Sequence, residues 1–232
     1  SVAVDSQFNV YVGDDGKHVT KLDSNGNQLW QWTSPSGSIT HSLAVDSQSN
    51  VYAGASYGYL TKLNSSGKQL WQWVASSDIE SVAVDSQFNV YVGDGSNHVT
   101  KLDQNGKQLW QWTASNYIAS VAVDSQFNVY AGDSGGIVTK LDSNGNKIWQ
   151  WEAPNSVCSV AVDSQFNVYA GGYSDYVTKL DSNGNKIWQW KAPNSVNSVA
   201  VDSQFNVYVG DYSDYVTKLD SNGKQVWQWN AS

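Results

Sequence analysis

The chain is built from short runs in which apolar and polar residues alternate, and each run ends at a turn rich in Asp, Asn, Ser or Gly. The first copies of these runs read "SVAVD", "NVYVG", "HVTKL" and "QLWQW". Alternation with a period of two, in runs dominated by Val, Tyr, Thr and Trp, is typical of half-buried β-strands. No stretch has the i, i+3, i+4, i+7 spacing of an amphipathic helix. The pattern therefore predicts an all-β protein.

The set of four runs recurs six times along the chain. The aspartate of "VAVD" stands at Asp5, Asp46, Asp85, Asp124, Asp163 and Asp202, at spacings of 41 and then 39 residues. A unit of four antiparallel strands cannot cover both of its faces, and radial stacking of such units buries each sheet against the next. We predict a six-bladed β-propeller with four antiparallel strands per blade. We expect a single domain over residues 1–232, with blades at about 1–41, 42–80, 81–119, 120–158, 159–197 and 198–232.

Two turn sequences recur with the strands. "DSQFN" joins the first two strands, where Asp can bond to its own backbone, and "DSNGN" joins the last two, where Asn-Gly supplies the positive φ angles of a tight hairpin. The oxygens of Asp23, Asn25 and Asn27 have the spacing of a calcium loop, but the distant bidentate acid of that loop is missing. The six "VAVD" aspartates could form a cation-binding ring, or each could cap its own turn. We expect turn capping, and we predict no metal site.

Two tryptophans, separated by one residue, occur in every fourth run. Residues i and i+2 of a strand share a face, so both rings of a pair point the same way. We predict that they dock one blade on the next, and full burial of each ring contributes at most about 4–6 kcal/mol. The alternative is that the rings stack on sugars in pockets between blades, as in a lectin. The pairs are Trp30 and Trp32, Trp71 and Trp73, Trp110 and Trp112, Trp149 and Trp151, Trp188 and Trp190, and Trp227 and Trp229.

The stretch "KLDSNGKQVW" at 218–227, with its five sister copies, resembles the tryptophan-docking motif of the pyrroloquinoline-quinone-type propeller repeat. The first half of the repeat, "VAVDSQFNVYVGD", is similar to NHL-type bacterial propeller repeats. The resemblance implies a propeller whose tryptophans lock blade to blade, but such repeats occur on enzymes, assembly factors and scaffolds alike. Quinone-dependent enzymes of this kind usually have eight blades, a cofactor at the axis and a bound Ca²⁺ with a catalytic acid. No residue set here matches that site, and Glu80 and Glu152 are the only glutamates, so we predict no cofactor.

The composition argues against nucleic acid as a partner and against a membrane-spanning segment. The net charge is −8, there is no arginine and the thirteen lysines are dispersed. A nucleic-acid partner would require a basic footprint, so we exclude it. No apolar run approaches the roughly 18 residues of a membrane span, so we expect a soluble protein with no membrane partner. The compartment is not fixed by the sequence, although an extracellular or periplasmic one is slightly favoured.

Chemically reactive residues are few. Cys158 is the only cysteine, so no disulfide forms within the chain. The histidines are His18, His41 and His98, and no serine or cysteine stands at a spacing that suggests a nucleophile with its base. We therefore predict no catalytic residue and no enzyme.

Sequence variation among the six repeats is concentrated in two sets of loops, while the other turns are nearly invariant. These are the loops between the second and third strands and the linkers between blades, which a propeller places on one face around its central channel. Loops on a rigid scaffold are where binding residues usually lie. The candidate contact residues are Tyr57, Tyr59, His98, Tyr173, Tyr176, Tyr212 and Tyr215 on the loops, and His41, Glu80, Tyr117, Cys158 and Asn197 on the linkers.

These observations predict a monomeric, non-catalytic scaffold that uses the variable face to bind a small molecule, a glycan or a protein. Two alternatives remain open, namely a glycan-binding lectin with inter-blade pockets, and a designed or recently amplified repeat protein without an evolved ligand. The chain begins at "SVAVD" with no methionine, so we expect a processed, excised or engineered fragment.

Overall fold

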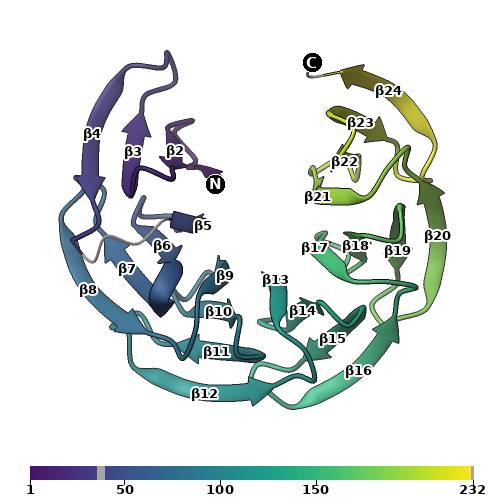
Figure 1. Ribbon diagram of the computed structural model, residues 1–232, viewed down its shortest axis with the longest axis horizontal. Coiled ribbons are helices and arrows are strands. Elements are labelled where there is room, and N and C mark those ends of the chain that lie inside the picture. The colour runs from purple at the N-terminus through teal and green to yellow at the C-terminus, as the bar shows by residue number, and fades with distance from the viewer. Residues whose placement is uncertain (36–39, 231–232) are drawn as a thin grey trace. The chain divides into compact units, whose positions relative to one another are not determined.

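The computed structural model describes residues 1–35 and 40–230 and consists almost entirely of β-strands (Figure 1). Its strands form six four-stranded antiparallel sheets, each made of four strands consecutive in the chain. We call these sheets blades 1 to 6. The prediction of an all-β propeller with six blades of four antiparallel strands is confirmed.

The chain divides into two compact units of three blades each, Ser1–Thr113 and Ala114–Ser232, and each is described by itself. The extent of the whole chain as a single domain stays a prediction. In the first unit, the only helix among the described residues is the short 3₁₀ segment η1 (Ser56–Gly58). The strands of this unit are β1 (Val2–Val4), β2 (Val10–Gly13), β3 (His18–Leu22), β4 (Gln28–Thr33), β5 (Thr40–Val45), β6 (Val51–Ala55), β7 (Tyr59–Leu63), β8 (Gln69–Val74), β9 (Ile79–Val84), β10 (Val90–Asp94), β11 (His98–Leu102) and β12 (Gln108–Thr113).

The second unit repeats the same order of strands without a helix among its described residues. Its strands are β13 (Ile118–Val123), β14 (Val129–Asp133), β15 (Ile137–Leu141), β16 (Lys147–Glu152), β17 (Val157–Val162), β18 (Val168–Gly172), β19 (Tyr176–Leu180), β20 (Lys186–Lys191), β21 (Val196–Val201), β22 (Val207–Asp211), β23 (Tyr215–Leu219) and β24 (Gln225–Asn230). No helix of the described residues has the length and apolar character needed to cross a membrane.

Each blade has two faces that the strand register defines. In blade 1, Tyr11, Lys21 and Trp30 lie opposite one another across β2, β3 and β4, and Trp32 lies opposite Val19. We call this the exit face, because it packs on the following blade. The opposite face, which carries residues such as Leu43 and Val51 in blade 2, is the entry face, because it packs on the preceding blade.

The hydrophobic core lies in the joints between exit and entry faces. Tyr11 and Val19 of blade 1 form one buried cluster with Leu43 and Val51 of blade 2, and Trp30 packs at its edge. Equivalent clusters join blades 2 and 3, blades 4 and 5, and blades 5 and 6. Because the same residue types repeat, each joint within a unit is built in the same way.

Two hydrogen bonds fix each joint at its inner and outer ends. At the outer end, the first Trp of a pair donates from Nε1 to a carbonyl in the next blade's last turn, at 2.9–3.1 Å. At the inner end, a serine Oγ accepts from a backbone N–H of the next blade's first strand, as in Leu43 N to Ser1 Oγ at 3.1 Å. Val82, Val160 and Val199 donate in the same way. A hydrogen bond of this kind contributes about 0.5–1.5 kcal/mol to stability.

The turn between the last two strands also explains a repeated glycine. Asp23 accepts from the backbone N–H groups of Asn25 and Asn27, and Gly26 has a φ of +86°. We predicted that Asn-Gly supplies the positive φ angles of this turn, and this holds for Gly26 but not for Asn25. The carboxylate of Asp23 anchors a longer loop in which only glycine adopts the left-handed conformation.

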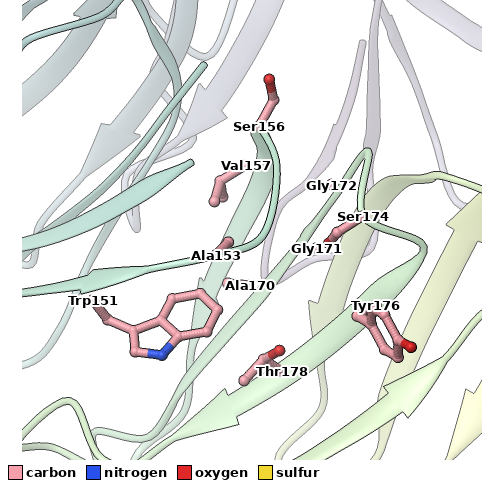
Figure 2. Close-up of a pocket in the computed structure, with 10 residues that line it drawn as sticks. All are labelled: Trp151, Ala153, Ser156, Val157, Ala170, Gly171, Gly172, Ser174, Tyr176 and Thr178. Atoms are coloured by element: carbon pink, nitrogen blue, oxygen red, sulfur yellow. The ribbon is translucent and has the colours of Figure 1, made fainter. Parts of the chain in front are cut away.

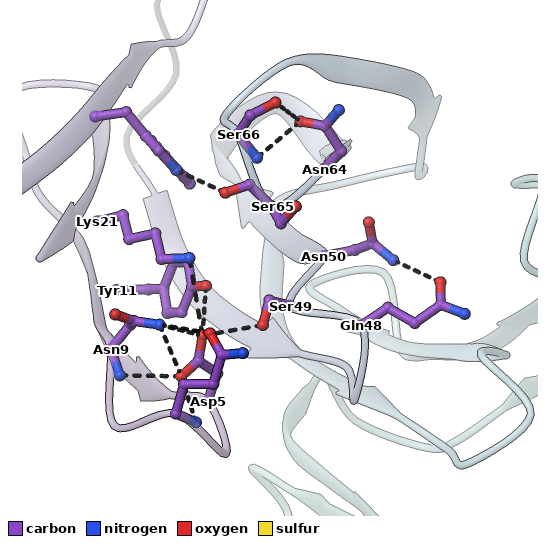
Figure 3. A network of polar contacts seen from close by, with 12 residues as sticks. Asp5, Asn9, Tyr11, Lys21, Gln48, Ser49, Asn50, Asn64, Ser65 and Ser66 are labelled. Atoms are coloured by element: carbon purple, nitrogen blue, oxygen red, sulfur yellow. Dashed lines mark hydrogen bonds and ion pairs between the residues drawn. The ribbon is translucent and has the colours of Figure 1, made fainter. Parts of the chain in front are cut away.

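The "VAVD" aspartate caps its own turn and also organises the blade interior (Figure 3). Asp5 accepts from the backbone N–H groups of Gln7 and Asn9, and from Tyr11 Oη at 2.9 Å. Lys21 Nζ lies 3.8 Å from Asp5 and 5.1 Å from the centre of the Tyr11 ring. Burial raises the pKa of Asp5, but the hydrogen bonds outweigh it and hold the pKa well below its ordinary range. The hydrogen bonds confirm turn capping.

Candidate functional site

The variable loops and linkers meet at one end of each blade, which we call the variable end. The loop between the second and third strands bonds through its backbone to the linker that precedes the first strand. Ser134 N donates to Tyr117 O at 3.0 Å, and Tyr173 N donates to Ser156 O at 3.1 Å. These bonds hold both variable segments in fixed positions beside each other.

Four of the five linker candidates lie inside a first strand, at a β-bulge. In blade 3, Asp94 pairs with Ile79 and Gly93 pairs with Ser81, so Glu80 is the extra, unpaired residue. The same register shift places His41, Cys158 and Asn197 at the bulge of their blades. Our prediction that these residues lie on linkers was therefore wrong, since the first strands begin one residue before them. A bulge re-aims the side chain of its extra residue and is common next to functional sites.

The bulge is also the chemically variable position of the first strand. The residues that follow it are Ser, then Val or Leu, Ala, Val and Asp in every one of these blades. At the bulge itself stand His41, Glu80, Ala119, Cys158 and Asn197. Each of blades 2 to 6 thus presents a different side chain on an otherwise constant strand.

In the second unit the structure brings three predicted residues together. The rings of Tyr173 and Tyr212 lie with their centroids 5.9 Å apart, and their hydroxyl oxygens are 3.4 Å apart. The Tyr212 hydroxyl, and then the Cys158 thiol, raise the pKa of Tyr173 to about 12. Burial raises the pKa of Cys158, while hydrogen bonding to Tyr173 partly offsets this. The cluster is an exposed aromatic pair next to a thiol whose raised pKa keeps it protonated at neutral pH.

In the first unit the variable end holds a histidine–serine pair that the spacing of residues did not reveal. His41 Nε2 lies 3.0 Å from Ser56 Oγ. Glu80 is half-buried, and burial raises its pKa while the nearby His41 lowers it. His41 is exposed on its bulge, so the pair lies open to solvent. The proximity follows from the pairing of β5 with β6, which only the folded register shows.

Tyr57 is the most exposed of the aromatic candidates, at 72%. Its φ of 59° and ψ of 19° are a left-handed backbone conformation that residues with a side chain rarely adopt. Asp78 Oδ1 accepts from Tyr57 N at 2.7 Å and holds the loop in place. Blade 2 therefore holds a solvent-exposed ring in a strained conformation, a combination that is frequent at binding sites.

The other loop candidates lie at the start of third strands and are half-buried. They are Tyr59, His98, Tyr176 and Tyr215. His98 Nδ1 lies 3.3 Å from Asp94, whose carboxylate also accepts from His98 N, so this histidine is part of a loop cap.

Tyr176 lines an open hollow of about 180 Å³ at the variable end of blade 5 (Figure 2). The hollow depends on Gly172, which replaces the aspartate of four other blades, and a side chain there would collide with the Ser156 carbonyl. Trp151, Ser174 and Thr178 also line it, and none of its lining residues is charged. Much of this space is open to solvent, and its enclosed part holds about one water molecule, far less than a typical ligand pocket. Among the residues that the structure describes, no three His, Cys, Asp or Glu side chains cluster as metal ligands would.

The exposed aromatic rings, the bulge side chains and the rigid joints define a β-propeller with a varied surface at one end of its blades. A family model described as outer membrane protein assembly factor BamB matches residues 15–229. The chain belongs to this family of pyrroloquinoline-quinone-type propeller repeats, which confirms the resemblance seen in the docking motif. Compared with curated proteins, the sequence matches none significantly.

Proposed function

We propose that the protein is a non-catalytic binding module that recognises another protein through the variable end of its blades. The observation that carries this proposal is the change of chemistry at the bulge, from imidazole to carboxyl, methyl, thiol and amide, on a first strand that is otherwise constant. A set of different groups in fixed positions suits an asymmetric partner.

The form of the surface favours a protein over a small molecule. Tyr173 and Tyr212 are 46% and 52% exposed, and Tyr57 projects in the same class of loop. Exposed tyrosines supply large contact area at low conformational cost and are enriched in protein interfaces. The shallow hollow beside Tyr176 is too small for a typical ligand. The family description names an assembly factor, which agrees with a protein partner.

The single thiol of the chain offers a direct test. A benzophenone maleimide on Cys158 should cross-link the partner after illumination in an extract, and mass spectrometry would identify it. The matched control carries Cys158→Ser with Gln126→Cys, which moves the probe to an exposed turn between the first and second strands, away from the variable end. The purified partner should then lose at least about ten-fold in affinity with the Tyr173→Ser/Tyr212→Ser variant, since aromatic hot spots contribute 2 kcal/mol or more. Equal cross-linking from both probe positions, or unchanged affinity, would refute the proposal.

The non-catalytic part of the proposal has its own test at the histidine–serine pair. We expect Ser56 not to react with a fluorophosphonate probe above the level of the Ser56→Ala variant. Labelling that depends on both Ser56 and His41 would instead indicate a hydrolase. A glycan array tests the lectin alternative. Saturable glycan binding that survives the tyrosine substitutions would favour it.

A further inference from the structure

The net charge of the chain is not spread evenly along each blade. The strands and turns that repeat from blade to blade carry eleven aspartates and eleven lysines, so their formal charges cancel. The variable loops and linkers carry the other ten carboxylates and only two lysines. The whole formal charge of −8 therefore lies at the variable end of the blades.

Each compact unit carries half of this charge by itself. Five carboxylates and Lys17 give −4 in the first unit, and five carboxylates and Lys191 give −4 in the second. Exposed charges act over about 8 Å at physiological ionic strength and concentrate groups of the opposite sign. The variable end of either unit therefore favours a cationic partner. The carboxylates are Asp14, Asp15, Asp78, Glu80 and Asp94 in the first unit, and Asp133, Glu152, Asp175, Asp211 and Asp214 in the second.

In the second unit these carboxylates adjoin the exposed pair of tyrosines. Asp175 stands two residues after Tyr173, and Asp211 and Asp214 stand on either side of Tyr212 in the equivalent loop. The two rings have their centroids 5.9 Å apart, which brings both loops together. Tyr173 belongs to the middle blade of this unit and is 46% exposed. Aromatic rings and carboxylates thus share one surface.

The interior of each blade shows how this protein holds a cation. Lys179 Nζ lies 5.1 Å from the centre of the Tyr169 ring, and the Tyr169 hydroxyl donates to Asp163 at 2.9 Å. The same set of lysine, tyrosine and aspartate recurs in all six blades. The variable end of the second unit presents tyrosine and aspartate again, but among the described residues no lysine lies over the ring of Tyr173 or Tyr212. The ring faces there are open to a cation from another molecule.

We propose that the tyrosine pair and its flanking aspartates bind a segment of the partner protein that is rich in arginine and lysine. This inference rests on the proposed function and names the chemistry of the partner's surface. A cation is attracted both to the face of an aromatic ring and to a carboxylate, and complementary charge speeds the encounter and disfavours wrong partners. Arginine should be preferred to lysine, because its planar guanidinium stacks on an aromatic face and donates two N–H groups to a carboxylate.

Fluorescence anisotropy with labelled peptides tests this chemistry without the natural partner. Four short peptides of equal length share a Gly-Ser frame and differ only in carrying Arg, Lys, Gln or Glu at the same positions. The Arg peptide should bind most tightly and the Lys peptide next, while the Gln and Glu peptides should not bind. The affinity for the Arg peptide should fall as the salt concentration rises, because salt screens exposed charges.

Two variants with the same change of charge locate the binding. Asp175→Asn/Asp214→Asn removes two charges beside the tyrosines, and both residues have a positive φ that asparagine also adopts readily. The matched control, Asp142→Asn/Asp181→Asn, removes two charges from turns at the opposite end of the blades in the same unit. Asn64 already occupies this place in blade 2 and accepts from two backbone N–H groups of its turn, so the control should fold.

The two variants should differ in their affinity for the Arg peptide. The first should bind it about three-fold more weakly or worse at low salt, because each lost ion pair contributes modestly, and the control should bind as the wild type does. Equal binding of the Arg, Lys and Gln peptides, binding of none of them, or an equal loss in the control would overturn the inference. The proposed function would still be decided by the cross-link from Cys158, since that experiment uses the natural partner.

Discussion

Replacement of Tyr130 by Phe tests how much the buried network of each blade contributes to stability. Tyr130 is fully buried, and its hydroxyl donates to Asp124 Oδ2 at 3.0 Å. Lys140 Nζ lies 5.2 Å from the centre of its ring. Tyr130→Phe keeps the ring and the cation–π contact but removes one donor to a buried carboxylate. A hydrogen bond to a charged group contributes about 1.5–3 kcal/mol, so we expect a loss of about 2 kcal/mol.

Tyr208 provides a matched control in the same compact unit. It makes the same bond, to Asp202 at 3.1 Å, but both partners are only half-buried. Solvent can replace the lost donor there, so Tyr208→Phe should cost about 1 kcal/mol or less. Urea denaturation near pH 7, followed by tryptophan fluorescence, gives both values from one transition. Equal losses, or a larger loss for Tyr208→Phe, would refute the claim that burial sets the strength of this bond.

The pH dependence adds a second signature. Burial, and then Asp124, raises the pKa of Tyr130, so the folded state keeps this hydroxyl protonated where the unfolded chain loses the proton. A group with a raised pKa contributes its full stability below its unfolded pKa of about 10, and that contribution falls as the pH rises further. The difference in stability between wild type and Tyr130→Phe should therefore be constant near neutral pH and shrink above about pH 10.

Three further outcomes follow from the same geometry. Gly184→Ala should lower the free energy of unfolding by about 1–3 kcal/mol more than Gly26→Ala does. Both glycines have positive φ, but only at Gly184 does an indole lie 3.0 Å from the new Cβ. Equal denaturation midpoints for the two variants would contradict this. The pKa of Asp5 is held below 3.8, so the stability that its carboxylate contributes is present above that pH and is lost as the pH falls further. The Asp5→Asn variant should be less stable near neutral pH, and its stability, followed by circular dichroism, should fall less steeply on acidification. Burial raises the pKa of Cys158, and Tyr173→Phe should raise it again and slow alkylation by iodoacetamide at neutral pH; faster alkylation would show that access, and not the hydroxyl, governs the thiol.

Most of the fold could be predicted from the sequence because each strand carries its own signal. The alternation in "NVYVG" and "QLWQW" fixes which residues share a face, and six copies of one pattern fix the blade number. The strand boundary near Glu80 could not be predicted, because a bulge is a property of two paired strands. Nothing in "DIESVAV" alone shows that Ile79 and Ser81 pair with adjacent residues of β10.

The sequence nominated residues for the candidate site but could not show how they are arranged. Variation among repeats indicated Tyr173, Tyr212 and Cys158, yet their proximity depends on the docking of adjacent blades. The pair of His41 and Ser56 escaped prediction because the residues are separated along the chain by a complete hairpin turn. Comparison of equivalent positions in strand and loop, blade by blade, would have placed these two residues together.

The bulge in the first strand separates two requirements that a strand residue normally has to meet together. A paired residue must suit both the ladder and the face on which it lies, whereas the extra residue is outside the ladder. Substitution at His41, Glu80, Cys158 or Asn197 can therefore change the chemistry of the variable end while the register and the joints stay as they are. In this fold, the chemistry of the variable end can be altered one blade at a time without a compensating change elsewhere in the repeat.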